Sequence, residues 1–481
     1  MTENLQKHML SGMVWTFARQ FSMQAFAFVE GIILARMLQP SDYGLITMTT
    51  IFFAISGCFI DSGFATALIK KKDRTEIDYS TVFVTNVCLT AFFSTLLCLC
   101  SPLIANFYGE PILVKIVCAN ALLLFLNSFF TIQNTRLSIT LQFKAQNIIR
   151  VITNVTVGIV TIIMAILGYG VWALIWPNFL QPILNGFQYW RVQHWFPGIK
   201  FSWKSWKEFF SFGSNILVTN LISTIYSNIY PLVVGKKFSA TSLGYFSKAQ
   251  RYADMPAYTL RTVLGPVAFP VLSTIQDDDL RLGDAYRRLI SLSGYLVFPL
   301  LVGLAAIANP FILILITEKW QPSVVYLQIL CFAFMWSPIQ MLNLDLMKVK
   351  GRSDLLLKLE IIKKVLGISI LIISIPFGLI YMCVGQVITA LISVTINTYY
   401  TSKLLKVGFS NQLNDLLPSF LYATTMGIIV YLCTLVIKNL WLQILVGVTV
   451  GACYYYFISV ITKSADLVYL KMLVKTHLLK K

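Results

Sequence analysis

The feature that most constrains this chain is a succession of long apolar runs. A run of about 20 mainly apolar residues is long enough to cross a lipid bilayer as one helix. Only 12% of the 481 residues are charged, about half of what the solvated surface of a soluble domain requires. The sequence therefore predicts an all-α integral membrane protein with about fourteen transmembrane helices and no separate soluble domain. The predicted spans are 12–34, 43–68, 79–104, 111–134, 149–168, 171–190, 209–234, 242–272, 287–316, 323–347, 359–378, 381–402, 416–437 and 440–462.

The sequence offers little to support catalysis or cofactor chemistry. The nine cysteines fall inside apolar runs without metal spacing, which is typical of small apolar residues at helix interfaces. The three histidines share no metal spacing, and no glycine-rich phosphate loop is present. The first apolar stretch, residues 11–38, is too long for a cleaved signal and is expected to remain as a span. We therefore expect a transporter, neither an enzyme nor a metal or cofactor protein.

The distribution of basic residues indicates the orientation in the membrane. Fourteen spans with a cytoplasmic N-terminus place most of the 38 lysines and arginines in inner loops and termini. Lysine and arginine resist translocation, so both termini are predicted to be cytoplasmic. The net charge of +18 is spread over short loops, which argues against a nucleic-acid partner and is consistent with contact to anionic membrane lipids.

The chain also repeats itself. Residues 32–44 align without a gap with residues 232–244, and each copy ends one predicted span and begins the next at a glycine. Six spans separate the copies, so the repeat is parallel, a pattern seen in transporters that bind substrate between two lobes. We predict two six-helix lobes, residues 1–200 and 201–408, followed by two extra C-terminal helices within residues 409–481.

Ionisable residues inside spans are costly and are therefore candidates for function. In the eighth span five polar residues are spaced by 3, 3, 4 and 3, which predicts one shared helix face. The candidates are Arg19 and Glu30 in the first span, Asp61 in the second, and Lys248, Arg251, Asp254, Tyr258 and Arg261 in the eighth.

Three of these candidates, and Asp345 in the tenth span, also have a structural explanation. Lys248 or Arg261 can snorkel to the membrane interface. Asp61 can cap a helix or pair with the basic loop at residues 70–72. Asp345 is expected to form an interfacial pair with Lys348.

Six stretches of the sequence resemble the oligosaccharide flippases of bacterial polysaccharide export. These belong to the Wzx-like branch of the multidrug/oligosaccharidyl-lipid/polysaccharide exporter superfamily, and the colanic-acid and teichuronic-acid exporter clade is the most similar. The last two predicted spans match only in hydropathy. The stretches that carry the resemblance are residues 34–45, 61–69, 107–111, 168–174, 243–251 and 269–273.

The resemblance implies two lobes that face a central cavity and a bacterial inner-membrane location. It also implies a cargo, an undecaprenyl-diphosphate-linked sugar repeat unit, and polysaccharide polymerase machinery as a partner. A diphosphate requires cations, so the expected substrate-binding residues are Arg19, Lys248, Arg251, Tyr258 and Arg261. Relatives are thought to couple to cation flux, for which Asp254, Glu30 and Asp61 are the candidates.

Two alternatives stay open from the sequence alone. A drug or small-molecule exporter of the same fold is one, although a cationic cavity disfavours cationic drugs. A membrane enzyme of polysaccharide assembly is the other, although nearly all outer loops are short.

Overall fold

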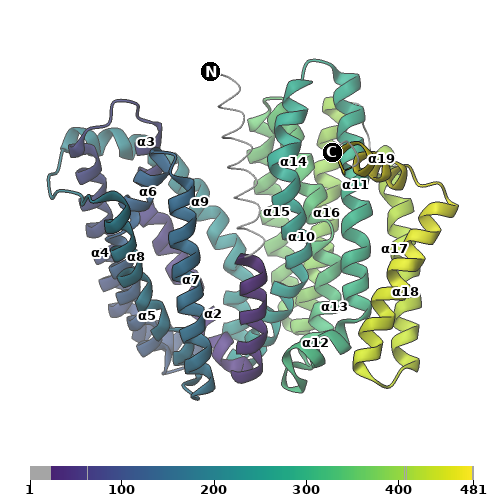
Figure 1. Cartoon of the computed structure of the whole chain (residues 1–481), viewed down its shortest axis with the longest axis horizontal. Coiled ribbons are helices and arrows are strands. Elements are labelled where there is room, and N and C mark those ends of the chain that lie inside the picture. Colours follow the sequence, from purple (N-terminus) through teal and green to yellow (C-terminus); the bar gives the residue numbers. More distant parts are fainter. Residues whose placement is uncertain (1–22, 62, 406, 408, 479–481) are drawn as a thin grey trace. The chain divides into compact units, whose positions relative to one another are not determined.

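The computed structural model describes residues 23–61, 63–405, 407 and 409–478 of the chain. Every regular element in this described part is a helix (Figure 1). The chain divides into two compact units, Met1–Gly244 and Tyr245–Lys481. The prediction of an all-α membrane protein is therefore confirmed for the described residues, while the three-part division at residues 200 and 408 stays a prediction.

The first unit consists of long helices interrupted by short ones. Its largest helix packing involves α4 with α5, α2 with α9, and α7 with α8. The first turn of α10 also belongs to this unit. The elements are a helix over residues 23–37, α2 (Pro40–Asp61), α3 (Phe64–Lys70), α4 (Glu76–Tyr108), α5 (Leu113–Ser128), α6 (Thr131–Ile139), α7 (Phe143–Ile166), η1 (Gly170–Leu174), η2 (Trp176–Phe179), α8 (Leu180–Gln193) and α9 (Trp203–Lys237).

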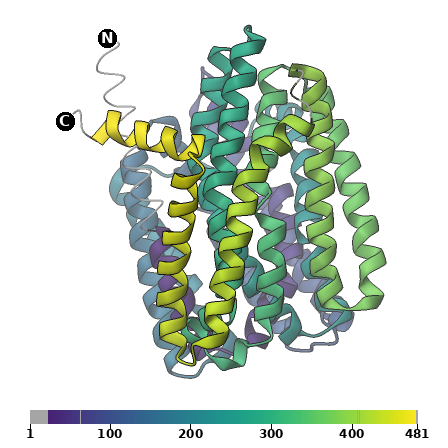
Figure 2. The ribbon, with the colours of Figure 1, turned by 90° about the vertical axis from the view of Figure 1, so that its right-hand side faces the viewer.

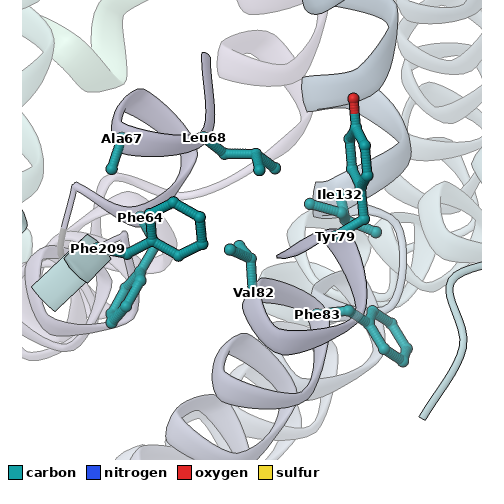
Figure 3. Close-up of a cluster of buried hydrophobic side chains, with 8 residues drawn as sticks. All are labelled: Phe64, Ala67, Leu68, Tyr79, Val82, Phe83, Ile132 and Phe209. Atoms are coloured by element: carbon teal, nitrogen blue, oxygen red, sulfur yellow. The ribbon is translucent and has the colours of Figure 1, made fainter. Parts of the chain in front are cut away.

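Local chemistry sets the ends of α4 and anchors it to its neighbours. The Thr75 side chain and the Asp78 carboxylate cap each other's backbone N–H groups at its start, and Gly109 ends it with a positive φ of 76°. Beside this start, α3, α4, α6 and α9 bury a shared hydrophobic cluster (Figure 3). The cluster comprises Phe64, Ala67, Leu68, Tyr79, Val82, Phe83, Ile132 and Phe209.

The second unit is a bundle in which the C-terminal helices are fully integrated. Helix α17 packs along α11, and α18 packs on α17 (Figures 1 and 2). Helix α19 lies across the end of α18 in Figure 2. The elements are α10 (Ala240–Thr274), α11 (Asp279–Ala306), α12 (Ala308–Ile316), η3 (Glu318–Trp320), α13 (Ser323–Phe334), α14 (Ser337–Val349), α15 (Ser353–Ser374), η4 (Ile375–Phe377), α16 (Leu379–Leu405), α17 (Phe409–Val436), α18 (Leu440–Ile461) and α19 (Ala465–Leu478).

A buried hydrogen-bond network holds α17 in the second unit. Gln412 of α17 donates to the Tyr286 hydroxyl and to Thr401 Oγ1, each over 3.0 Å, and accepts from Thr398 over 2.9 Å. The Tyr286 hydroxyl in turn donates to Asn343. Polar groups inside a membrane bundle require such partners, so these bonds help to hold α17 against α11, α14 and α16.

The predicted spans fall on helical segments in the described residues, but the count of fourteen is not confirmed. Non-helical residues divide five of the predicted spans between two or more helices, namely 43–68, 111–134, 171–190, 287–316 and 323–347. By length and composition, nine described helices are apolar enough to span a membrane, or ten if the bent pair α5–α6 is one span. Helix α10 falls outside this number because it carries charges and three prolines, and α8 is only 14 residues long. The composition of these helices, as well as their length, therefore determines the count.

The repeat reappears in the local geometry of the first unit. One helix ends at residue 37 and another at residue 237, and α2 and α10 begin three residues later. The two glycines of the repeat sit at a close helix crossing. A Cβ at Gly44 would lie 1.7 Å from the Ala240 carbonyl oxygen, and one at Gly244 would lie 1.9 Å from the Pro40 carbonyl oxygen. All four residues belong to the first unit, and each glycine contacts the helix start of the other copy.

Candidate functional site

The five polar residues of the predicted eighth span, which corresponds to α10, do not all share one helix face. At 3.6 residues per turn, the four residues from 251 to 261 fall within about 80°, whereas Lys248 lies roughly 60–140° away from them. The structure agrees, since Lys248 is buried at 5% exposure while Arg251 and Tyr258 are exposed. The shared face predicted from the sequence was therefore wrong for Lys248, because each step of three residues falls short of a full turn.

Lys248 lies in an aromatic environment within the second unit. Its ammonium nitrogen is 5.7 Å from the ring centroid of Trp320 and 6.0 Å from that of Tyr252. The face of an aromatic ring attracts a cation, most strongly where water is excluded. The side chain thus links α10 to η3.

The exposed face of α10 carries an ion pair and an arginine. Arg261 Nη2 lies 2.8 Å from Asp254 Oδ1, with both side chains about one-third exposed. The Arg261 guanidinium also lies 5.8 Å from the ring centroid of Tyr258. Arg251 lies one turn from Asp254, but the carboxylate pairs with Arg261, seven residues further along the helix. Arg251 therefore keeps an exposed guanidinium beside this pair.

The acidic candidates of the first unit occupy different settings. Glu30 is half-buried, and its carboxyl carbon lies 3.2 Å from the position that a Cβ would take at Gly158 of α7. Asp61 is exposed and ends α2 just before Gly63, whose φ is 70°. A carboxylate gains nothing from the negative end of a helix dipole, so Asp61 is not a helix-stabilising charge. Arg19 lies outside the described residues.

The basic loop after α3 finds its partners elsewhere than Asp61. Lys71 Nζ lies 3.1 Å from Asp78 Oδ1 and 3.0 Å from Glu208 Oε2. Burial lowers the pKa of the Lys71 ammonium, but the hydrogen bonds to Glu208 and Asp78 outweigh burial and raise that pKa above its usual value. The predicted pair of Asp345 and Lys348 is confirmed, at 2.8 Å.

The first unit contains a polar cavity that the sequence did not lead us to predict, because its lining is made mainly of uncharged polar side chains, above all amides. It has a volume of about 320 Å³ and lies between α5, α6, α7 and α8. Helices α5 and α6 meet there at a bend of 41°. A signal was present, since the apolar runs between residues 111 and 190 hold many asparagines and glutamines. The cavity is lined by Asn127, Phe130, Thr131, Asn134, Arg150, Thr153, Asn154, Gln181, Asn185 and Tyr189.

The geometry supports binding of an anionic or hydroxyl-rich molecule better than it supports a metal. The exposed guanidinium of Arg251, the partly exposed guanidinium of Arg261 and the amides that line the cavity all carry N–H groups that can donate to such a molecule. Within the residues that the structure describes, no group of three histidine, cysteine, aspartate or glutamate side chains is placed to hold a metal ion.

Comparisons with known proteins identify relatives along the whole chain. It is 24% identical to the teichuronic acid biosynthesis protein TuaB of Bacillus subtilis, over 95% of this chain and 96% of the relative. It is 25% identical to the lipopolysaccharide biosynthesis protein WzxC of Escherichia coli, over 91% of this chain and 89% of the relative.

Solved structures show the same fold. The lipid II flippase MurJ in an inward closed conformation matches with a TM-score of 0.76 and 17% identity, over 95% of this chain and 100% of that one. An inward-facing multidrug transporter of the MATE family matches with a TM-score of 0.63 and 14% identity, over 79% of this chain and 95% of that one. The family model described as "polysaccharide biosynthesis protein" matches residues 33–325, more than half of the chain. This multi-pass membrane protein therefore belongs to the polysaccharide biosynthesis protein family.

Proposed function

We propose that this protein is a flippase for a lipid-linked oligosaccharide. It turns a sugar repeat unit carried on undecaprenyl diphosphate from the cytoplasmic to the periplasmic leaflet. The observation that carries the proposal is a double match over almost the full chain, to relatives named for teichuronic acid and lipopolysaccharide biosynthesis and to the fold of a lipid II flippase. Two lobes that expose the cargo alternately to the two sides suit such a transfer.

The exposed face of α10 is the proposed contact for the diphosphate. Arg251 is exposed, and Arg261 is only partly covered by its pair with Asp254. A guanidinium binds phosphate oxygens in a bidentate manner, and Tyr258 adds a hydroxyl beside Arg261. Lys248 would contribute charge from its buried position, and Arg19 remains a proposed contact from the first span.

A drug exporter is the second candidate, because the fold likeness extends to a multidrug transporter. Exposed arginines on α10 disfavour cationic drugs as cargo, since like charges repel strongly where the dielectric constant is low. An exporter of this kind would change the drug sensitivity of cells and leave their surface polysaccharide intact.

A cellular experiment tests the proposed function. Cells that lose this protein are expected to accumulate lipid-linked repeat units and to lose the surface polysaccharide, because the repeat units no longer reach the outer leaflet. Extracted glycolipids and surface polysaccharide are measured, and wild-type protein supplied in trans restores both. Unchanged surface polysaccharide with altered drug sensitivity would favour the exporter instead.

The proposed orientation places both termini in the cytoplasm of an inner-membrane protein. With the nine native cysteines replaced, Pro111→Cys and Gln321→Cys are expected to react with an impermeant thiol reagent added to intact cells. Lys72→Cys and Lys204→Cys are the inner controls and are expected to react only after the cells are opened. All four positions are exposed in the structure. Labelling in the reverse pattern would invert the orientation. A polysaccharide polymerase that accepts the delivered units is the proposed partner.

Cation coupling of the proposed transport would act through a carboxylate that changes its charge. Asp254 is the first candidate, because loss of its charge would release Arg261 from the ion pair and change the charge of the α10 face. An ion biases a two-state transporter only by its differential affinity for the two states. Glu30 and Asp61 are the candidates in the first unit.

A further inference from the structure

The polar cavity of the first unit lies where an ordinary membrane-spanning helix would be continuous. Helices α5 and α6 are separated by Phe129 and Phe130 and meet at 41°. Such a break leaves backbone groups without helical partners, which a membrane protein tolerates only inside protein or beside a cavity. In transporters, broken helices commonly form the substrate site. The break and the cavity are therefore one feature with a candidate binding role.

The amides of the cavity offer both acceptors and donors. Asn127 donates to the Leu123 carbonyl and Gln181 to the Asn178 side-chain oxygen, so these two leave their own oxygens available, whereas Asn134 and Asn185 are engaged through their oxygens. The Asn134 side-chain oxygen accepts from Gln146 Nε2 over 2.8 Å and from the Tyr189 hydroxyl over 3.3 Å. The Asn185 side-chain oxygen accepts from Thr153 Oγ1 over 2.9 Å. Because these oxygens are engaged, the groups that Asn134 and Asn185 can present to a ligand are their N–H donors.

Arg150 adds a cation to the same cavity. It lies on α7 two turns from the helix start and is exposed. In the described part of the chain, no aspartate or glutamate forms an ion pair with its guanidinium. A guanidinium beside amide donors is complementary to a carboxylate or another acceptor-rich group.

Two aromatic rings complete the wall and are held in place. Phe130 packs against α8 where residue 186 is a glycine, since a Cβ there would lie 2.8 Å from two atoms of the ring. Tyr189 is buried with Leu137 and Ile149, and Phe130 packs against the same cluster. The wall thus combines apolar rings with a few polar groups, among them the Arg150 guanidinium and the N–H groups of Asn134 and Asn185, as small-molecule sites do.

We propose that this cavity is a saccharide subsite, which binds one sugar ring of the cargo and prefers a ring that bears a carboxylate. The hydroxyls would accept from Asn134 and Asn185, the carboxylate would face Arg150, and the apolar face of the ring would lie on Phe130 or Tyr189. A volume of about 320 Å³ falls at the lower end of small-molecule sites. This inference rests on the proposed function, because a lipid-linked oligosaccharide supplies the sugar.

A protection experiment on the full chain tests the subsite. With the native cysteines replaced, Asn154→Cys at the exposed edge of the cavity is labelled by a small maleimide in the presence of glucuronate or glucose. Glucuronate is expected to slow labelling more than glucose does. Arg150→Leu should weaken glucuronate protection about tenfold, which corresponds to about 1.4 kcal/mol. Arg191→Leu is the matched control, since Arg191 lies on α8 and does not line the cavity, and it should keep the protection.

The remaining outcomes overturn the inference. Equal protection by inorganic pyrophosphate would make the cavity a phosphate site, and no protection by either sugar would remove the subsite. A glucuronate-dependent rise in the Tm of the protein with its native cysteines is the second readout and should be lost only in Arg150→Leu. A failure of the proposed function looks different, because glucuronate then still protects while reconstituted protein flips no lipid-linked cargo.

Discussion

Replacing Gly44 with alanine is expected to cause the largest loss of folded protein of any single change considered. The new Cβ would lie 1.7 Å from the Ala240 carbonyl oxygen and 2.5 Å from the carbonyl carbon, both of them backbone atoms. Non-bonded carbon atoms sit about 3.5–4.0 Å apart, so the two helix starts must separate by roughly 1.5–2 Å. We expect destabilisation at or above the upper end of core overpacking, about 3 kcal/mol. Gly244→Ala should behave alike, because its Cβ would lie 1.9 Å from the Pro40 oxygen.

The same helix provides the control for this prediction. Gly57 of α2 has nothing within 4 Å of its Cβ position. Gly57→Ala should therefore retain the wild-type Tm or exceed it slightly, because alanine favours a helix over glycine by about 1 kcal/mol. The Tm and the monodisperse fraction of purified protein are measured for all three variants. Equal values for Gly44→Ala and Gly57→Ala would show that the repeated glycines do not form a close crossing.

Arg251→Ala is expected to reduce flipping of a diphosphate-linked cargo by roughly 10- to 100-fold while leaving the Tm unchanged. This reduction is expected because a hydrogen bond to a charged group contributes about 1.5–3 kcal/mol, which the alanine variant would lose. Arg251 is exposed on α10, so its removal leaves no buried cavity. Arg251→Lys should recover part of the rate, since an ammonium provides a point charge but no planar fork.

The control for Arg251 is another exposed arginine of the second unit. Arg281 at the start of α11 pairs with Asp278 and has a side chain that is 80% exposed. Arg281→Ala should leave the initial flipping rate at the wild-type level. If Arg251→Ala and Arg281→Ala flip the cargo at the same rate, the exposed face of α10 does not hold the diphosphate.

Hydropathy predicted the fold well because the bilayer imposes helix length. The predicted spans fall on helical segments in the described residues, although breaks divide five of them, and the matching sequences at residues 32–44 and 232–244 adopt the same pattern of helix, short turn and helix. The sequence did not reveal that the two copies touch. Gly44 and Ala240 are nearly two hundred residues apart, and only the folded chain brings the glycine of one helix against the carbonyl of another.

The candidate site was harder to predict from the sequence than the fold, for three physical reasons. A spacing of 3, 3, 4 and 3 drifts around the helix, so Lys248 turned inward toward Trp320 while Arg251 remained exposed. The partner of Asp254 depends on side-chain reach, and the structure selects Arg261. The amide cavity was missed because asparagine and glutamine carry no charge, and hydropathy alone does not show that four helices gather them around one break.

Reconstitution in liposomes tests the central claim most directly. Purified wild-type protein is incorporated with a defined undecaprenyl-diphosphate-linked oligosaccharide, and the movement of the sugar across the bilayer is followed with and without a proton or sodium gradient. Asp254→Asn should reduce the dependence of the flipping rate on the proton or sodium gradient. Asp345→Asn, which removes a carboxylate paired with Lys348, should leave that dependence unchanged. We predict protein-dependent flipping of the lipid-linked sugar that is reduced in Arg251→Ala. If the sugar crosses the bilayer no faster in liposomes with the protein than in protein-free liposomes, whichever gradient is applied, the account is contradicted.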